Sequence, residues 1–177
     1  MKNGFSLVEM MVAVSLVALM ASIGFANMLR SNEQKRVTEA AETIRQAYTQ
    51  AKAYALAGRK DCTACGATGG VCGKGTTEVQ LEGWVSNLNS ATPSIEIHGE
   101  CGTSPAISFF SSGTKTFPTR ISVTTAGGNS AVKFRPLNGG IELNNTLTIT
   151  VTSTLSSIRS KRFTVSQNGE ISAIITL

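Results

Sequence analysis

An apolar run opens the chain and dominates its hydropathy pattern. Between Phe5 and Leu29 the only full charge is Glu9, and the other polar residues are small. A helix of this length extends about 37 Å, which is enough to cross the hydrocarbon core of a bilayer. A carboxylate in such a helix costs roughly 2.5–3.5 kcal/mol at the membrane centre. We therefore predict a membrane-spanning helix at residues 5–29, in which Glu9 needs a partner.

Beyond residue 29 the helical pattern continues but becomes amphipathic. Apolar residues recur at alternating spacings of four and three, which places them on one face of a helix: Val37, Ala41, Ile44, Tyr48, Ala51 and Ala55. Charged residues occupy the other faces, and no proline interrupts the segment. We predict that residues 30–57 continue the same helix and that Gly58 caps its C-terminus.

The pattern then changes to one typical of a loop followed by strands. Residues 58–77 are rich in glycine, cysteine and threonine, so we expect a loop there. Runs that favour strands follow at Glu78–Val85, Ser94–Gly99, Ile107–Phe110, Thr119–Thr124, Ala131–Arg135, Thr146–Thr152, Arg162–Ser166 and Glu170–Ile175. Asn168-Gly169 predicts a hairpin turn between the last two runs. A long helix followed by an antiparallel sheet is an α+β fold.

The few residues before the apolar run form a short basic leader that ends in Gly4. A secretory signal peptide has a shorter apolar region with small residues after it, so it does not explain this order. The segment Gly4-Phe5-Ser6-Leu7-Val8-Glu9 closely resembles the prepilin processing motif of type IV pilins and pseudopilins. The resemblance implies cleavage between Gly4 and Phe5, methylation of the new Phe5 amine, and an assembly role for the Glu9 carboxylate.

Helix geometry agrees with that mapping. Phe5 and Glu9 are four residues apart and share one helix face. Cleavage would create a positive amine at the start of an apolar helix, and the Glu9 carboxylate of an adjacent chain could neutralise it in a filament core. The alternative is a plain N-terminal membrane anchor whose Glu9 reaches the interface.

The resemblance also implies a fold, a location and partners. A pilin-like chain has a leader at residues 1–4, a transmembrane and filament-core helix at 5–29, an amphipathic helix at 30–57 and a β-rich head at 58–177. It is anchored in the cytoplasmic (inner) membrane with the head outside, and then enters an extracellular or periplasmic filament. The implied partners are other pilin subunits, the prepilin peptidase, the membrane and the inner-membrane assembly platform.

The C-terminal part resembles, more loosely, the GspH/FimT-type minor pilins and pseudopilins. The resemblance lies in the segment Phe134-Arg135-Pro136-Leu137-Asn138-Gly139-Gly140-Ile141 and in the terminal hairpin. We therefore expect a structural subunit of a type IV pilus-like filament. The alternatives are a pseudopilin of a type II secretion system and a minor pilin that binds DNA for uptake.

Charge alternates in blocks along the chain, whose net charge is +5. Residues 1–60 carry a net charge of +4, residues 61–101 a net charge of −4, and residues 102–177 a net charge of +5. Such blocks suit contacts between neighbouring subunits. They also fit a solvated surface.

Four cysteines, Cys62, Cys65, Cys72 and Cys101, follow the spacing C-x2-C-x6-C-x28-C. Four thiolates can hold zinc, and Cys62 with Cys65 can form a redox pair. A head outside the cell membrane lies in oxidising conditions, which favour disulfides. We expect two structural disulfides and no metal, and three pairings remain open.

Residues for catalysis are scarce, so we expect a protein that is not an enzyme and holds no cofactor. His98 is the only histidine, and no Gly-rich phosphate-binding loop is present.

Arg159, Lys161 and Arg162 form a basic cluster before the last hairpin. Clustered cations attract phosphates, so this cluster is a candidate DNA-binding site. A solvated loop or a subunit contact is the alternative.

Overall fold

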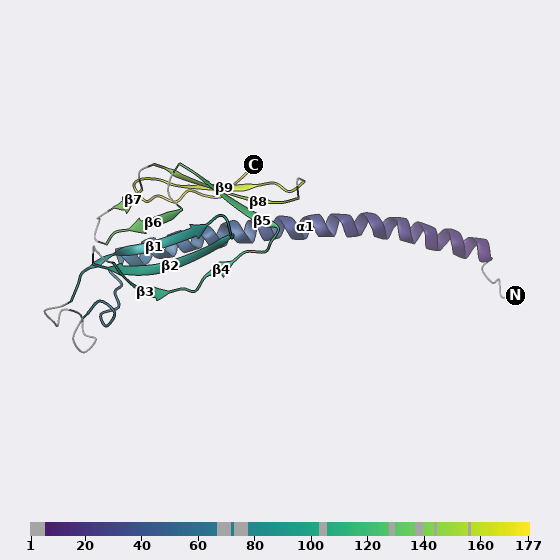
Figure 1. The fold of residues 1–177 in the computed structure, drawn as a ribbon. Helices are drawn as coiled ribbons and strands as arrows, with labels where there is room; N and C mark the ends of the chain where they lie inside the picture. The colour runs from purple at the N-terminus through teal and green to yellow at the C-terminus, as the bar shows by residue number, and fades with distance from the viewer. Residues whose placement is uncertain are drawn as a thin grey trace.

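The computed structural model describes residues 6–66, 72, 78–102, 106–127, 130–136, 140–143, 145–155 and 157–177. Within them the chain forms one long helix followed by ten strands, which are arranged in two antiparallel sheets. The N-terminal half of the helix extends away from the sheets as a free stem, and the C-terminal half packs against them (Figure 1). The α+β class predicted from the sequence is therefore observed.

Helix α1 spans Leu7–Leu56 without interruption. It ends where the sequence predicts, because Gly58 adopts a positive φ of 61° that other residues disfavour. The Gly58 amide donates to the Ala55 carbonyl, and the Arg59 amide donates to the Tyr54 carbonyl, each at 3.0 Å. These two bonds make a Schellman motif, which satisfies carbonyls that the helix end would leave unpaired. No helix in the described part of the chain is long and apolar enough to be recognised as a membrane span.

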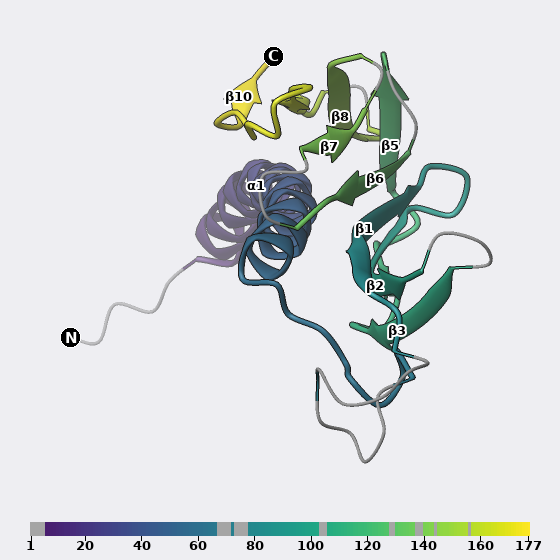
Figure 2. The same ribbon diagram turned by 90° about the vertical axis from the view of Figure 1, so that its left-hand side faces the viewer.

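The apolar face predicted for the second half of the helix is confirmed. All of its members are buried: Val37, Ala41, Ile44, Tyr48, Ala51 and Ala55. They join a hydrophobic core that includes residues from both sheets. Figure 2 looks nearly along α1. The sheet that contains β1 and β2 lies on one side of the helix, and the sheet that contains β8 and β10 lies over a neighbouring side. Burial of this stripe therefore attaches the head to the helix.

The larger sheet has the strand order β3-β2-β1-β6-β7, and β4 also pairs with β2. Its strands are β1 (Leu81–Asn89), β2 (Ser94–Cys101), β3 (Ile107–Ser111), β4 (Lys115–Thr116), β6 (Ala131–Phe134) and β7 (Ile141–Glu142). The smaller sheet has the order β10-β9-β8-β5. Its strands are β5 (Ile121–Ala126), β8 (Leu147–Ser153), β9 (Lys161–Val165) and β10 (Ile175–Thr176).

Two predicted strand starts are wrong. In each case a backbone amide near the predicted start donates to a loop or turn carbonyl and not to a neighbouring strand. The strand expected from Glu78 begins at Leu81, since the Val79 amide donates to the Cys65 carbonyl at 3.0 Å and is held by the cysteine loop. The strand expected from Thr119 begins at Ile121, whose amide donates to the Pro118 carbonyl at 2.9 Å and closes a turn. The short strands β4 and β7 were not predicted.

The predicted strand Glu170–Ile175 is mostly absent. Only a bridge between Val165 and Ile171 and the two residues of β10 pair with β9. The reason lies at Ser172, whose carbonyl accepts a 3.1 Å hydrogen bond from Arg45 of α1, while its hydroxyl accepts from the Thr164 amide at 2.8 Å. The turn itself is confirmed, since the Gly169 amide donates to Ser166 and the Ser166 amide donates to Glu170.

An aromatic group closes the core near the end of α1. Trp84 of β1 is fully buried, and its indole donates to the Arg59 carbonyl at 2.8 Å. The Tyr54 ring lies 4.7 Å from it and the Phe109 ring 5.5 Å from it, between ring centroids. As the only tryptophan of the chain, Trp84 reports directly on whether the head is folded.

Candidate functional site

The exposed apolar stem, which we define as residues 7–29 of α1, is the most unusual feature of the molecule. Every large apolar side chain described between residues 7 and 29 is more than half exposed, from 52% at Leu29 to 76% at Leu7. Soluble monomers rarely expose continuous apolar surface on this scale. The stem therefore has the chemistry of a segment that lipid or other protein chains cover.

Glu9 lies in the first turn of the stem, and its nearest partner is Ser6. Ser6 is the N-cap of α1, and its hydroxyl accepts a 3.2 Å hydrogen bond from the Glu9 amide. The Ser6 amide in turn donates to the Glu9 carboxylate at 3.4 Å. This reciprocal capping box satisfies two backbone donors and places a negative charge at the positive end of the helix dipole.

Glu9 was singled out from the sequence, but the capping role of Ser6 was missed. The signal was available, because Ser-x-x-Glu before an apolar run is the sequence pattern of a capping box. The processing residues Gly4 and Phe5 lie outside the described residues. The first residue that the structure describes is Ser6, which follows the predicted cleavage point.

A buried carboxylate lies where the stem enters the head. Glu33 is only 5% exposed, and its Oε1 contacts Arg36 of the same helix at 3.0 Å and Arg120, just before β5, at 3.6 Å. One helical turn earlier, Arg30 donates to the Ser157 carbonyl at 3.2 Å. These contacts join the stem to the smaller sheet at the level of residues 30–36.

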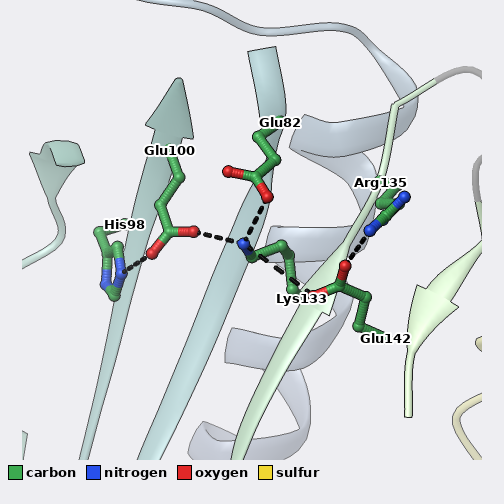
Figure 3. A network of polar contacts seen from close by, with 6 residues as sticks. All are labelled: Glu82, His98, Glu100, Lys133, Arg135 and Glu142. Carbon is green, nitrogen blue, oxygen red and sulfur yellow. Dashed lines mark hydrogen bonds and ion pairs between the residues drawn. The ribbon is translucent and has the colours of Figure 1, made fainter. Parts of the chain in front are cut away.

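Charged residues on the outer face of the larger sheet form a connected network (Figure 3). Lys133 of β6 lies 3.0 Å from Glu82, 2.7 Å from Glu100 and 4.0 Å from Glu142. His98 contacts Glu100 at 3.3 Å, and Arg135 pairs with Glu142. The only histidine of the chain therefore lies within this surface network, beside Glu100.

Opposing effects set the pKa values in this network. Burial raises the pKa of the Glu100 carboxyl, but the hydrogen bonds and charges of Lys133 and His98 outweigh it and leave the pKa below its usual value. Burial lowers the pKa of Lys133, but Glu100 and Glu82 outweigh it and leave the pKa raised. Both groups are therefore held in their charged forms at neutral pH.

The four cysteines form two disulfides, Cys62–Cys72 and Cys65–Cys101. Their Cα atoms are 5.1 and 5.7 Å apart, within the usual range for disulfides. The second bond ties the loop after α1 to the end of β2, and both of its cysteines are fully buried. Two disulfides fit the expectation from the sequence. In the described part of the chain no three His, Cys, Asp or Glu side chains are grouped so as to hold a metal ion.

The basic residues proposed for DNA are distributed over different surfaces. Lys161 and Arg162 are consecutive in β9, so their side chains point to opposite faces of the smaller sheet. Lys161 donates to the Thr176 hydroxyl at 2.7 Å. Arg159 is exposed in the loop before β9. The strand therefore does not gather the three cations on one face, and DNA binding stays a prediction.

A comparison with known families finds a match at the N-terminal end of the chain. Residues 1–25 match the family model described as the prokaryotic N-terminal methylation motif. That motif, at the start of a long helix that leads into an α+β head, indicates a type IV pilin-like or pseudopilin protein. No curated protein and no solved structure matches the chain significantly.

Proposed function

We propose that this chain is a structural, non-enzymatic subunit of a type IV pilus-like filament that is assembled through its N-terminal helix. The observation that carries the proposal is the stem, whose described large apolar side chains are all more than half exposed. The methylation motif at residues 1–25 supports it independently. We propose that prepilin peptidase cleaves after Gly4 and that the mature chain begins at Phe5.

The stem has two successive environments in this proposal. Before assembly, residues 5–29 lie in the cytoplasmic membrane and the head faces outward. During assembly, the inner-membrane platform moves the stem from lipid into a bundle with the stems of other subunits. Apolar side chains are buried in both environments, so the transfer needs little change in hydrophobic free energy. The filament is then extracellular, or periplasmic if it belongs to a secretion system.

Glu9 sets the axial offset between neighbouring stems in this bundle. Its carboxylate makes one 3.4 Å contact with its own Ser6 amide, near the long end of the hydrogen-bond range. The methylated Phe5 amine of a neighbouring chain would offer a stronger, charge-assisted partner. In an apolar bundle an unpaired carboxylate is costly, so the pairing favours one axial offset between subunits.

The test replaces Glu9 with Ala and compares it with Glu39→Ala. Glu39 is an exposed carboxylate on the same helix, level with the head, and makes a matched control. We expect both variants to reach normal membrane levels, and only Glu9→Ala to be missing from sheared filaments. Incorporation of Glu9→Ala at the wild-type level would contradict the proposed assembly role. Proteomic identification of the other chains in the filaments would separate a pilus from a secretion pseudopilus.

A further inference from the structure

The end of the head from which the stem emerges carries a set of exposed cations around an exposed leucine. We call this set the neck surface and define it as Arg30, Arg36, Arg120, Leu155 and Arg159. Leu155 is 41% exposed. The four arginines are also exposed. The surface is therefore both cationic and apolar.

Hydrogen bonds bring these residues together from three separate segments. The Thr154 amide donates to the Arg120 carbonyl at 2.9 Å, which joins the loop after β8 to the segment before β5. Arg30 of the helix donates to the Ser157 carbonyl at 3.2 Å, which joins the same loop to the stem. The Ile158 amide donates to the Leu155 carbonyl and folds the loop into a turn. These bonds hold the three segments that carry the neck surface next to one another.

The charges of this surface are mostly uncompensated. Arg36 and Arg120 share a single carboxylate, that of the buried Glu33. Arg30 donates to a backbone carbonyl, which carries no full charge. Arg159 has no hydrogen bond or ion pair among the described residues. Four cations against one carboxylate leave an excess of positive charge at this end of the head. The outer face of the larger sheet differs, since Lys133 and Arg135 there lie among Glu82, Glu100 and Glu142.

The neck surface lies directly after the apolar run of α1. Arg30 follows directly after Leu29, the last residue of the apolar run. The helical part of that run, residues 7–29, is about 35 Å long, close to the thickness of a bilayer's hydrocarbon core. A membrane-inserted stem therefore places Arg30, and the loop bound to it, in the headgroup layer of the outer side.

We propose that the neck surface binds anionic phospholipid headgroups and thereby holds the head against the membrane before assembly. The proposal rests on the proposed function, because it requires the stem to be inserted. Arginines in the headgroup layer attract anionic lipids, and an adjacent leucine enters the boundary between headgroups and acyl chains. The excess of cations identifies the partner as an anionic lipid surface.

The test uses the full disulfide-bonded chain in nanodiscs, made of phosphatidylcholine alone or with about one third phosphatidylglycerol. Amide hydrogen exchange is measured by mass spectrometry. We expect the amides of residues 154–155 and 157–159 to exchange about tenfold more slowly in the anionic nanodiscs, since each cation near such a surface contributes about a fivefold factor in binding. Exchange in β3 and β4, outside the neck surface, should be the same in both lipids.

Paired variants separate the two parts of the interaction. Arg159→Gln and Leu155→Ser should each remove most of the added protection. Lys115→Gln and Ile107→Ser, which change an exposed cation and an exposed apolar residue elsewhere in the head, should not. Unchanged exchange in β8 verifies that the head of each variant is folded.

Three results would overturn the proposal. Protection that is equal in the two lipids, with the stem amides protected, would show that the head ignores lipid charge although the stem is inserted. Protection that arises only in assembled filaments would mean that the neck surface contacts a second copy of the chain. Fast exchange throughout the stem in both nanodiscs would reject membrane insertion, and with it the membrane stage of the proposed function.

Discussion

At the scale of single residues, Lys133 connects three strands of the larger sheet through their carboxylates. Its ammonium group lies within 4.0 Å of three carboxylates on three different strands, and only 19% of its side chain is exposed. Without this cation, Glu82 and Glu100 would be partly buried without an opposite charge between them. Sequence could not predict the network, because Glu82 and Glu142 are 60 positions apart and meet Lys133 only through strand pairing.

The first prediction concerns Lys133→Gln. We expect the free energy of unfolding at pH 7 to fall by about 2 kcal/mol, because charged hydrogen bonds are lost and partly buried carboxylates lose their cation. Arg135→Gln is the control, since Arg135 is exposed and pairs mainly with the half-exposed Glu142; its effect should be small. Urea unfolding of the full chain in detergent, followed by Trp84 fluorescence, measures both.

The same variant should change the pH dependence of stability. In the wild type the pKa of Glu100 is lowered on folding, so this group stabilises the head at neutral pH and that contribution is lost as the pH falls through its folded pKa. In Lys133→Gln, only His98 still opposes the effect of burial on the pKa of Glu100, so less stability depends on the charged form of this carboxyl. We expect the loss of unfolding free energy between pH 7 and pH 3 to be smaller in Lys133→Gln than in the wild type. An unchanged loss would show that Lys133 does not control Glu100.

At the scale of elements, helix α1 follows directly from the sequence and the sheets follow only in part. The 3.6-residue periodicity and Gly58 gave the buried face and the end of the helix, because both are local signals. The strand predicted at Glu170–Ile175 failed, because the Ser172 carbonyl is bonded to Arg45 of α1, a contact between residues 127 positions apart. The two-residue strands β4 and β7 carry too few residues to show alternation.

The second prediction concerns the disulfides, whose pairing the sequence left open. Cys65–Cys101 closes a separation of 36 residues and is buried, whereas Cys62–Cys72 closes a separation of 10 and lies in the loop. Loop entropy alone gives about 4 kcal/mol for the first bond and about 3 kcal/mol for the second. We expect the Cys65→Ala/Cys101→Ala pair to lose more stability, since it also removes buried contacts.

The matched double variant Cys62→Ala/Cys72→Ala is the control for that comparison. Urea unfolding of both proteins with Trp84 as the probe gives the two losses directly. A larger loss for the Cys62–Cys72 pair would contradict the role assigned to the buried bond in holding β2 to the loop that follows α1.

At the scale of the whole molecule, the chain divides into a head that buries its own apolar side chains and a stem that leaves them exposed. The head buries its apolar residues between α1 and two sheets, and two disulfides join its loops. The stem leaves its apolar side chains uncovered and carries one carboxylate near its tip. The sequence could predict the stem because its composition alone sets its chemistry. It could not locate the neck surface, which forms only when three distant segments meet.

The proposed assembly depends on processing at the tip of the stem, since a free amine at Phe5 is what Glu9 of a neighbour would bind. The most direct measurement is the intact mass and N-terminal sequence of the chain extracted from its native membranes. We predict a chain that begins at Phe5 and carries one added methyl group on its amine. A chain that begins at Met1, or one cleaved after residue 25 as a secretory signal would be, would contradict it.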